Sequence, residues 1–360
     1  MTLSTRWLIA ACAALLCVAA RAEVSEVRIT KQFGLGFLPL MVMEDQKLVE
    51  KQSKAAGLPE VKGVFMTLSN PAAMNDGLLS GQIDFGTNGP PAMITIWART
   101  RGSGNEIKGV AGMVLTPMWL NVNNPAVKSI RDLTEKDKIA VTAVKVSIPA
   151  IIMQMAAMKE CGKDSYAKLD PLTVSMSHPD GMAAFLSKRD ISGHFTSPPF
   201  MYKELEQPGI HRIMSSDDVM GGPTTFSNLY STSKFHDANP RTYKAVLAAF
   251  TEAIELINKD KKHAAEIYLR VSGDKKSTVA EIQKHSERIG HRDYSHISTL
   301  EMLFAPTGPI QEASMSSGWA REYLAVAERF DEEIKRLGVV WSSPNKAKVA
   351  EPGSGGSACG

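Results

Sequence analysis

The chain has 360 residues, of which 44% are hydrophobic and 22% charged, and its formal net charge is +3. Two arginines and no acidic residue lie in the first 22 residues, so the remainder carries only +1. A nearly neutral chain lacks the basic surface typical of nucleic-acid binding or of attachment to an anionic membrane, and we expect neither partner.

Residues 1–22 have the pattern of a secretory signal peptide. An early arginine precedes an apolar run from Trp7 to Ala20, and a small-x-small sequence ends at Ala22, where we expect cleavage. The run is shorter than the roughly 20 residues that span a bilayer. An uncleaved anchor and a lipoprotein attached through Cys12 or Cys17 are the alternatives. The sequence therefore predicts export.

Only two cysteines remain after such cleavage, Cys161 and Cys359. Two cysteines this far apart predict neither a disulfide framework nor a metal site. Cys161 follows an apolar helical pattern, so we expect a small buried thiol there.

Strands and helices alternate through residues 23–117, which predicts the first part of a lobe with a parallel sheet covered by helices. Ser69-Asn70-Pro71 is a good helix start, because a capping side chain is followed by proline in the first turn. The strands are expected at 27–30, 61–67, 83–86 and 107–115, and the helices between them end near Lys51, Gly81 and Arg99.

Residues 118–222 repeat the alternation and predict a second, smaller lobe. The segment TPMWLNVNN is expected to cross to it in an extended form, and Ser147 caps a long apolar helix that Gly162 ends. Strands are expected within 129–144 and at 172–176, 190–195 and 211–216, with helices at 148–162, at 181–187 and up to Glu206.

Residues 223–342 are expected to return to the first lobe. TTFSNLYSTSKF reads as a second extended crossing, and Asn239-Pro240 starts a long amphipathic helix. Further helices are predicted over 260–273, 277–290 and 311–338, followed by a disordered tail over 343–360. Two crossings make a hinge, so the predicted α/β fold has two lobes that close on a cleft.

One sequence pattern occurs in both lobes. LLSGQIDFGTNGPPAM begins at Leu78 and FLSKRDISGHFTSPPFM begins at Phe185. Each segment predicts a helix end, a strand and a Pro-Pro loop. The alternative is that the similarity between the two segments is a coincidence. Ligands of open α/β sheets bind beyond the carboxyl ends of the strands, so both loops are expected to line one cleft. This rule selects the candidate ligand-binding residues Gly36, Phe37, Ser69, Asn88, Gly89, Trp119, Ser147, Ile148, His178, Thr196 and Ser197.

Several of these candidates have a purely structural alternative. Gly36 suits a tight turn, Trp119 a buried core and His178 a structural hydrogen bond. For Ser69 and Ser147 the structural interpretation is that each caps a helix. A helix start also offers free N–H groups and the positive end of the helix dipole to an anion.

Catalytic motifs are absent from the sequence. The glycines after the first strand do not complete a dinucleotide-binding loop, and there is no HExxH, CxxC, GxxxxGK[ST] or GxSxG pattern in the folded part. We therefore predict no enzyme, no cofactor and no metal. A secreted enzyme on the same two-lobe frame is the rival, and it requires a base and a nucleophile that converge in the cleft.

Several segments together resemble one known family. FGLGFLPLMVMEDQKLVEK, AAMNDGLLSGQIDFGTNGPPAM and KVSIPAIIMQMAAMKECG, in this order, resemble periplasmic solute-binding proteins of ABC importers in the nitrate/sulfonate/taurine group, whose fold thiamine-precursor binders share. The resemblance covers Val27 to Ser272. It implies a Venus-flytrap fold, a periplasmic location, no catalysis and delivery of a small solute to a membrane permease. We expect a monomer, and no signalling module is encoded that would make it a sensor.

The resemblance leaves the ligand open. Only Lys31 and Lys145 lie near the selected loops, so backbone amides at Ser147 and Ser69, with Trp119 and Phe37, suit a small sulfonate or carboxylate that has an apolar part. The rival ligand is a pyrimidine or another heteroaromatic, which requires stacking on these aromatic rings and polar partners such as Asn88 and His178.

Overall fold

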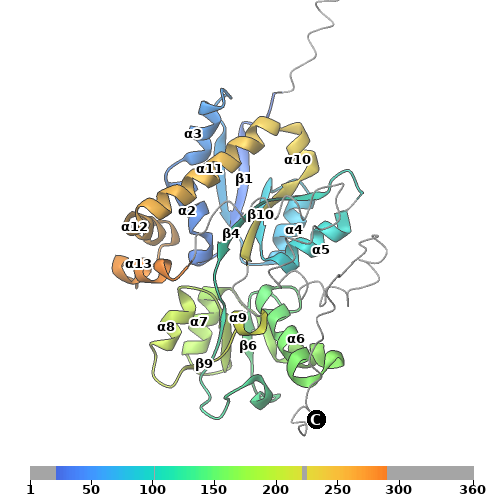
Figure 1. The fold of residues 1–360 in the computed structure, drawn as a ribbon, viewed down its shortest axis with the longest axis vertical. Coiled ribbons are helices and arrows are strands. Elements are labelled where there is room, and N and C mark those ends of the chain that lie inside the picture. The colour runs from blue at the N-terminus through green and yellow to red at the C-terminus, as the bar shows by residue number, and fades with distance from the viewer. Residues whose placement is uncertain (1–21, 101, 221–224, 290–360) are drawn as a thin grey trace, which may run out of the picture.

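The computed structural model describes residues 22–100, 102–220 and 225–289, which form two α/β lobes stacked along the long axis (Figure 1). Each lobe is built on a five-stranded sheet. The strands of lobe I are β1 (Glu26–Lys31), β2 (Lys62–Thr67), β3 (Phe85–Asn88), β4 (Ile107–Leu115) and β10 (Thr225–Thr232). Those of lobe II are β5 (Trp119–Val122), β6 (Ile139–Val141), β7 (Thr173–Ser175), β8 (Gly193–Thr196) and β9 (His211–Ser215).

The two sheets follow the same plan. Their strand orders are β2-β1-β3-β10-β4 and β7-β6-β8-β5-β9. In each sheet one strand runs against the other four, namely β10 in lobe I and β5 in lobe II, because it pairs antiparallel with both of its neighbours. The predicted fold, with two lobes of mostly parallel sheets, is confirmed.

Helices cover both faces of the lobe I sheet (Figure 1). The long helix α11 packs on α2 and α3 on one face, whereas α4 and α5 cover the other. Phe85 and Phe250 are buried in the core between these layers. The helices of lobe I are η1 (Leu35–Phe37), α2 (Leu38–Asp45), α3 (Leu48–Ala55), α4 (Pro71–Leu79), α5 (Pro90–Thr100), α10 (Ser233–Ala238), α11 (Pro240–Lys259), α12 (Lys261–Ser272) and α13 (Val279–Glu287).

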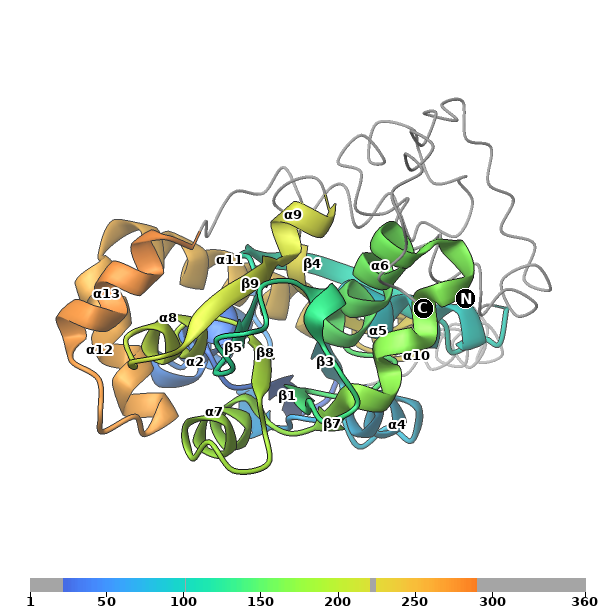
Figure 2. The same cartoon turned by 90° about the horizontal axis from the view of Figure 1, so that it is seen from below.

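Lobe II has the same layered arrangement. Its helices are η2 (Ile130–Asp132), α6 (Ile148–Cys161), η3 (Lys163–Leu172), α7 (His178–Leu186), α8 (Phe200–Leu205) and α9 (Ser216–Met220). Figure 2 shows α6 on one side of the sheet and α7 with α8 on the other. The apolar run of α6 is almost wholly buried, which explains why this helix lacks a polar stripe.

The chain passes between the lobes twice, between β4 and β5 and between β9 and β10. The two passages are bonded to each other. The Met118 N–H donates to Ser216 Oγ at 2.9 Å, and the Ser216 N–H donates to the Met118 carbonyl oxygen at 2.9 Å. This pair ties the connections together at the predicted hinge, while the exact segment boundaries at residues 117 and 222 stay predictions.

Further contacts join the lobes on either side of the hinge. The Leu35 N–H donates to the Pro198 carbonyl oxygen at 3.0 Å. Lys203 Nζ on α8 lies 2.6 Å from Asp274 Oδ2, in the segment that follows α12. The Tyr202 ring packs against His285 on α13. The structure therefore has lobe I and lobe II in direct contact.

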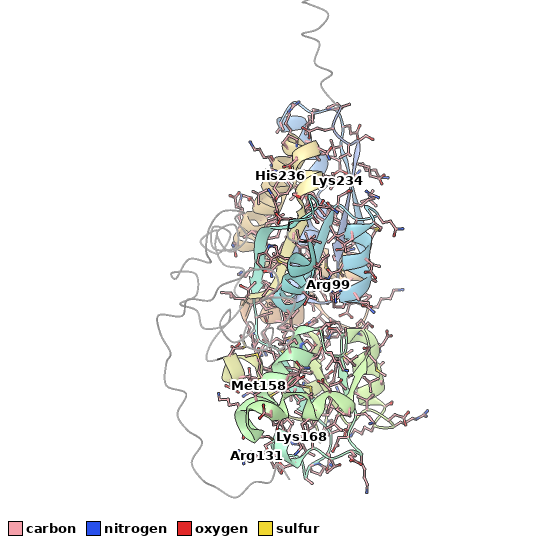
Figure 3. The ribbon with its side chains drawn as sticks, turned by 90° about the vertical axis from the view of Figure 1, so that its right-hand side faces the viewer. Arg99, Arg131, Met158, Lys168, Lys234 and His236 are labelled. Carbon is pink, nitrogen blue, oxygen red and sulfur yellow. The ribbon has the colours of Figure 1, made fainter. Side chains whose placement is uncertain are left out.

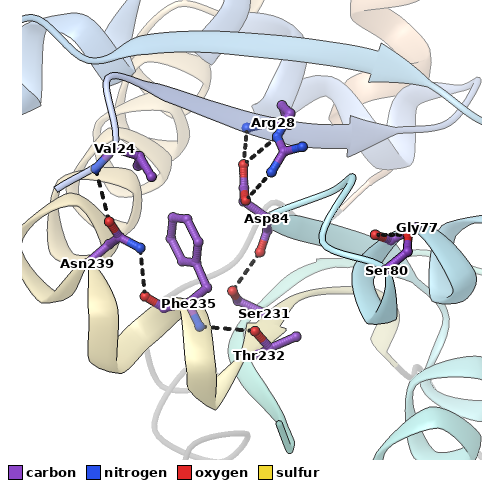
Figure 4. A network of polar contacts seen from close by, with 9 residues as sticks. All are labelled: Val24, Arg28, Gly77, Ser80, Asp84, Ser231, Thr232, Phe235 and Asn239. Atoms are coloured by element: carbon purple, nitrogen blue, oxygen red, sulfur yellow. Dashed lines mark hydrogen bonds and ion pairs between the residues drawn. The ribbon is translucent and has the colours of Figure 1, made fainter.

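Asp84 joins three separate segments of lobe I (Figure 4). Its carboxylate accepts bonds from the Arg28 backbone N–H at 2.8 Å and from the Arg28 guanidinium at 2.8 and 3.0 Å. Its carbonyl oxygen accepts a bond from Ser231 Oγ at 2.6 Å. Nearby, the Asn239 side chain accepts a bond from the Val24 N–H at 3.0 Å. These contacts fix β1 and β10 around the start of β3.

Four local predictions were wrong. The third strand lies at Phe85–Asn88 rather than 83–86, because Asp84 is used to bind Arg28. The first predicted helix is divided into α2 and α3 by Lys47, which has a left-handed φ of 51°. The predicted extended segment after 224 ends at Thr232, whose side chain caps α10. Cys161 is half-buried and disulfide-bonded, so the expected buried thiol was wrong.

Some predictions fall outside the described residues. These are the signal peptide apart from Ala22, the helix at 311–338 and the tail at 343–360. Within the described ranges, no helix combines the length and the apolar character that a bilayer crossing needs. Figure 3 shows exposed basic side chains spread over both lobes, with Arg99 and Lys234 on lobe I and Arg131 and Lys168 on lobe II.

Candidate functional site

A pocket lies between the two lobes, with about 360 Å³ of space between its walls when the open mouth is included. Lobe I, lobe II and the first crossing all contribute to it. The lining residues of lobe I are Gln32, Phe37, Pro71, Asn88, Gly89, Ala92, Phe226 and Ser227; those of lobe II are Thr142, Ser147, Ile148, Pro149 and His178; Met118 lies in the crossing.

Six of the eleven predicted residues line this pocket. Three come from lobe I and three from lobe II, so the structure brings both predicted sets of loops to one place. They are Phe37, Asn88, Gly89, Ser147, Ile148 and His178. Whether these residues contact a ligand stays a proposal.

Two of the other five are used in packing. The Trp119 ring is edge-on to Tyr202, with centroids 5.1 Å apart, and Arg212 lies over it at 4.8 Å. It forms no wall of the pocket. Gly36 is covered by Phe226, because a Cβ atom there would lie 2.4 Å from Cε1 of that ring. Close packing therefore accounts for this glycine.

The remaining three are not among the lining residues. Thr196 is buried, and its hydroxyl is 2.8 Å from Nδ1 of His178. Ser197 is buried with no partner for its hydroxyl in the described part of the chain. Ser69 is not a cap, because Asn70 caps α4 by accepting bonds from the Ala72 and Ala73 N–H groups at 2.8 and 3.4 Å. The cap predicted at Ser69 was therefore one residue too early.

Five helices of the described chain begin at this pocket. A lining residue occupies or adjoins the first turn of α2, α4, α5, α6 and α7. Each helix also has proline in its first turn, where the missing N–H costs no hydrogen bond. These prolines are Pro39, Pro71, Pro90, Pro149 and Pro179. A helix N-terminus carries the equivalent of about half a positive charge, so all five helix dipoles favour an anion here.

The start of α6 lies at the pocket through Ser147, Ile148 and Pro149. Ser147 occupies the cap position, but its hydroxyl donates to the Ala143 carbonyl oxygen at 2.5 Å instead of accepting a capping bond. Pro149 has no N–H, and the Ile151 N–H donates to the Ser147 carbonyl oxygen at 2.9 Å. The N–H groups of Ile148 and Ala150 are thus the two in this turn without an intrahelical acceptor. Ser147 was predicted correctly as the residue before the helix, but its hydroxyl does not cap it.

No lining residue carries a charge at neutral pH. Lys31, which was expected nearby, is buried and bonded to Glu44 at 2.9 Å and to Thr67 at 3.2 Å. Lys145 is exposed. Electrostatic attraction for an anion therefore comes from helix ends and neutral donors.

A buried polar network supports the lobe I wall. Asn88 Nδ2 lies 2.6 Å from the Tyr230 hydroxyl and 3.3 Å from the Pro71 carbonyl oxygen. The Tyr230 hydroxyl donates to Asn75 Oδ1 at 2.7 Å. Gln32 Nε2 donates to Asn88 Oδ1 at 3.2 Å. Both ends of the Asn88 amide are therefore occupied by protein partners.

His178 is held rigidly in the lobe II wall. Its ring stacks on Phe200, with centroids 5.6 Å apart, and Nδ1 bonds to Thr196. Burial lowers the pKa of His178 to about 3, with a smaller contribution from repulsion by His194. The imidazole is therefore neutral at physiological pH.

The buried neutral His178 predicts a loss of stability in acid. Its folded pKa of about 3 lies below the ordinary value of 6.5, so the unfolded chain binds more protons in this interval. Stability that is present above pH 6.5 is lost as the pH falls toward 3. We expect the thermal midpoint of His178→Gln to fall less between pH 7 and 4 than that of the wild type. His236→Gln, at a half-exposed ring, is the control, and parallel curves for all three proteins would contradict a buried neutral His178.

Eight lining residues were not predicted from the sequence. Gln32 and Thr142 directly follow β1 and β6, whereas the rule on carboxyl strand ends had selected residues further along the same two loops. Phe226 and Ser227 lie at the start of β10, which runs against β3 and so begins where β3 ends. Pro71, Ala92, Met118 and Pro149 complete the set. No pattern in the sequence marks the start of a reversed strand as part of a site.

Comparison with known proteins supports the two-lobe fold. The alkanesulfonate-binding protein SsuA from Xanthomonas axonopodis pv. citri, bound to MOPS, has a TM-score of 0.60 and 18% identity over 88% of this chain and 95% of its own. The periplasmic aliphatic sulphonate-binding protein SsuA from Escherichia coli has a TM-score of 0.57 and 19% identity over 88% and 97%. The periplasmic nitrate-binding protein NrtA from Synechocystis PCC 6803 has a TM-score of 0.59 and 14% identity over 87% and 91%.

These similarities confirm the predicted resemblance to periplasmic solute-binding proteins of ABC importers, and at such low identity they show the shared fold. No curated protein sequence matches the chain. Residues 20–272 match the model of the NMT1-like family. Because this match spans well over half of the 360 residues, the chain belongs to the NMT1-like family.

Proposed function

We propose that this protein captures a small organic anion, a sulfonate or a carboxylate, and delivers it to an ABC importer by closing its two lobes. The observation that carries this proposal is the meeting of five helix N-termini at one uncharged pocket between the lobes. Helix ends and neutral donors bind an anion without a counter-charge, and two lobes on a hinge can enclose it.

The lining suits an anion that has an apolar part. Phe37 and Phe226 meet edge to face with centroids 6.0 Å apart, and Met118, Ile148 and Pro149 add apolar surface. The same aromatic pair favours a heteroaromatic ligand as the second candidate. Asn88 is not available as a polar partner for such a ring, because its amide is occupied within lobe I.

The site favours binding over catalysis. The Ser147 hydroxyl donates to the Ala143 carbonyl oxygen, and Nδ1 of His178 bonds to Thr196. The Ser147 hydroxyl is therefore not bonded to His178, and burial, which lowers the pKa of His178 to about 3, makes its imidazole a weak base. In the described ranges, no three His, Cys, Asp or Glu side chains are placed to hold a metal.

The setting that we propose is the periplasm. The pattern of residues 1–22 suggests a cleaved signal peptide, and the related solved proteins include periplasmic ones. We further propose that the protein acts as a monomer, with the importer's membrane permease as its partner and no nucleic acid.

The test is a thermal-shift screen of the chain that begins at Glu23. The panel holds nitrate, alkyl and aryl sulfonates, small carboxylates and pyrimidines. A ligand at ~100 times its dissociation constant adds about 2.7 kcal/mol to the free energy of unfolding, which gives a clear upward shift. We expect shifts with sulfonates or carboxylates. Shifts confined to pyrimidines would replace the anion by the heteroaromatic candidate, and no shift from a protein shown ligand-free by mass spectrometry would overturn the proposal.

A substitution in α6 tests whether the anion binds in this pocket. Ile148→Pro removes the free N–H group of a lining residue and makes α6 begin with Pro-Pro, as α5 begins with Pro90-Pro91. The loss of one hydrogen bond to a charged group is worth about 1.5–3 kcal/mol, so we expect affinity for the anion to fall roughly 10- to 100-fold. Lys261→Pro, in the first turn of α12 and away from the pocket, is the matched control.

A further inference from the structure

Gln32 occupies a special position in the lobe I wall. It directly follows β1, its side chain lines the pocket, and the residue is 8% exposed. A polar side chain this deeply buried needs partners for both ends of its amide, because an unpaired buried group is costly.

The orientation of the Gln32 amide follows from its neighbours. Its nitrogen lies 3.2 Å from the Thr87 carbonyl oxygen and 3.2 Å from Asn88 Oδ1. Carbonyl oxygens only accept hydrogen bonds, so the group facing them must be the NH₂. Asn88 cannot be turned round either, since its own nitrogen faces the carbonyl oxygen of Pro71.

The other end of the amide is therefore an acceptor with a fixed position. Gln32 Oε1 has no hydrogen-bond partner among the residues that the structure describes. It is also not one of the polar atoms sealed from solvent without a partner. With its nitrogen turned toward β3, the oxygen is the polar atom that Gln32 presents to the pocket.

The pocket thus offers an acceptor as well as donors. Lobe II offers a donor, the N–H group of the lining residue Ile148 at the start of α6. Lobe I offers an acceptor, Gln32 Oε1. A simple alkyl sulfonate has no N–H or O–H to donate, so it would leave this oxygen buried and unpaired once the lobes close.

We propose that the ligand carries an N–H or O–H group that donates to Gln32 Oε1, in addition to the anionic group bound at α6. This rests on the proposed function and narrows its ligand class to hydroxy- or amino-substituted small sulfonates or carboxylates. Gln32 is then the residue that discriminates them from unsubstituted anions.

The experiment compares matched pairs by isothermal titration. The pairs are 2-hydroxyethanesulfonate with ethanesulfonate, 2-aminoethanesulfonate with ethanesulfonate, and glycolate with acetate. The hydroxyl pairs test the hydrogen bond without adding a charge. We expect the wild type to prefer the substituted member of at least one pair about tenfold, which is the effect of one net hydrogen bond.

Gln32→Met keeps the length of the side chain and removes the acceptor. It is expected to bring the ratio close to one while the unsubstituted member still binds. Gln46→Met, the same substitution at an exposed position, should leave the ratio unchanged. If circular dichroism shows that Gln32→Met is unfolded, Gln32→Glu replaces it, and this variant is expected to shift preference toward the amino-substituted member at least tenfold.

The outcomes separate the two proposals. Equal affinities within every pair in the wild type, or a preference that Gln32→Met or Gln32→Glu leaves unchanged, overturn the role of Gln32 while anion capture stands. If no member of any pair binds, anion capture and the role of Gln32 both fail.

Discussion

Replacing Gly89 with valine is expected to lower ligand affinity roughly 10- to 100-fold. Gly89 precedes α5 in lobe I and faces Ile148 at the start of α6 in lobe II. A Cβ atom at this glycine would lie 2.1 Å from Cγ1 and 2.3 Å from Cδ1 of Ile148. Overpacking of this kind costs about 1–3 kcal/mol, and here the cost falls on the closed arrangement of the lobes. Since about 1.4 kcal/mol is tenfold in affinity, the expected loss follows.

Two measurements check the effect of Gly89→Val. Titration with the best-bound anion of the screen gives the affinity, and small-angle X-ray scattering of the bound protein shows whether the lobes close. Ile148→Ala is the matched compensation, because it removes as many side-chain carbon atoms as the valine adds. The double variant should recover much of the lost affinity. A single variant with unchanged affinity would show that these two helix starts do not meet in the bound state.

Replacing Glu204 with leucine is expected to lower the free energy of unfolding by about 3–5 kcal/mol. Glu204 on α8 is fully buried. Its carboxylate lies 2.5 Å from Nδ1 of His194 on β8 and accepts a bond from Asn121 Nδ2 on β5 at 2.8 Å. Leucine leaves His194 Nδ1 buried without its partner and removes one of the two acceptors of Asn121 Nδ2, which keeps the Met201 carbonyl oxygen at 3.1 Å. His194 and Asn121 lie in neighbouring strands of the lobe II sheet.

Urea unfolding followed by circular dichroism measures this loss. Arg131→Leu breaks an exposed pair with Glu160 in the same lobe, where the two side chains are 42% and 39% exposed. An exposed pair contributes about 0–1 kcal/mol, so the control should change little. Similar midpoints for Glu204→Leu and the control would mean that the buried carboxylate does not stabilise lobe II.

The two-lobe fold was predictable because its signals are local. Alternating strands and helices, and prolines at helix starts such as Pro71 and Pro149, place each element without knowledge of distant contacts. The rule that ligands lie beyond strand ends then selected Ser147, Ile148 and His178, which do line the pocket. These residues line the pocket because each follows a strand closely in the chain, and a sequence reveals that position.

What the sequence did not reveal depends on residues far apart in the chain. Trp119 was predicted in the first crossing but begins β5, and its ring packs against Tyr202 and Arg212 without lining the pocket. Asn88 lies at the end of a strand as expected, yet Gln32 and Tyr230 occupy its amide. A sequence pattern shows that a polar group is near a site but not which partners it has already bonded. In the structure the amide of Asn88 is occupied at both ends, whereas Gln32 keeps an oxygen without a partner among the described residues.

The position of β10 has a consequence for the order in which the molecule can be completed. β10 lies between β3 and β4, and its Tyr230 bonds to Asn88, 142 positions earlier in the chain. All strands of lobe II lie within residues 119–215, between these two partners. As the chain emerges from its N-terminus, every strand of lobe II is available before the sheet of lobe I can receive its inner strand. Lobe I, although its first strands come first in the chain, is therefore the last sheet to be completed. The segment between Asn88 and Tyr230, which this pairing brings together, contains every strand of the lobe II sheet.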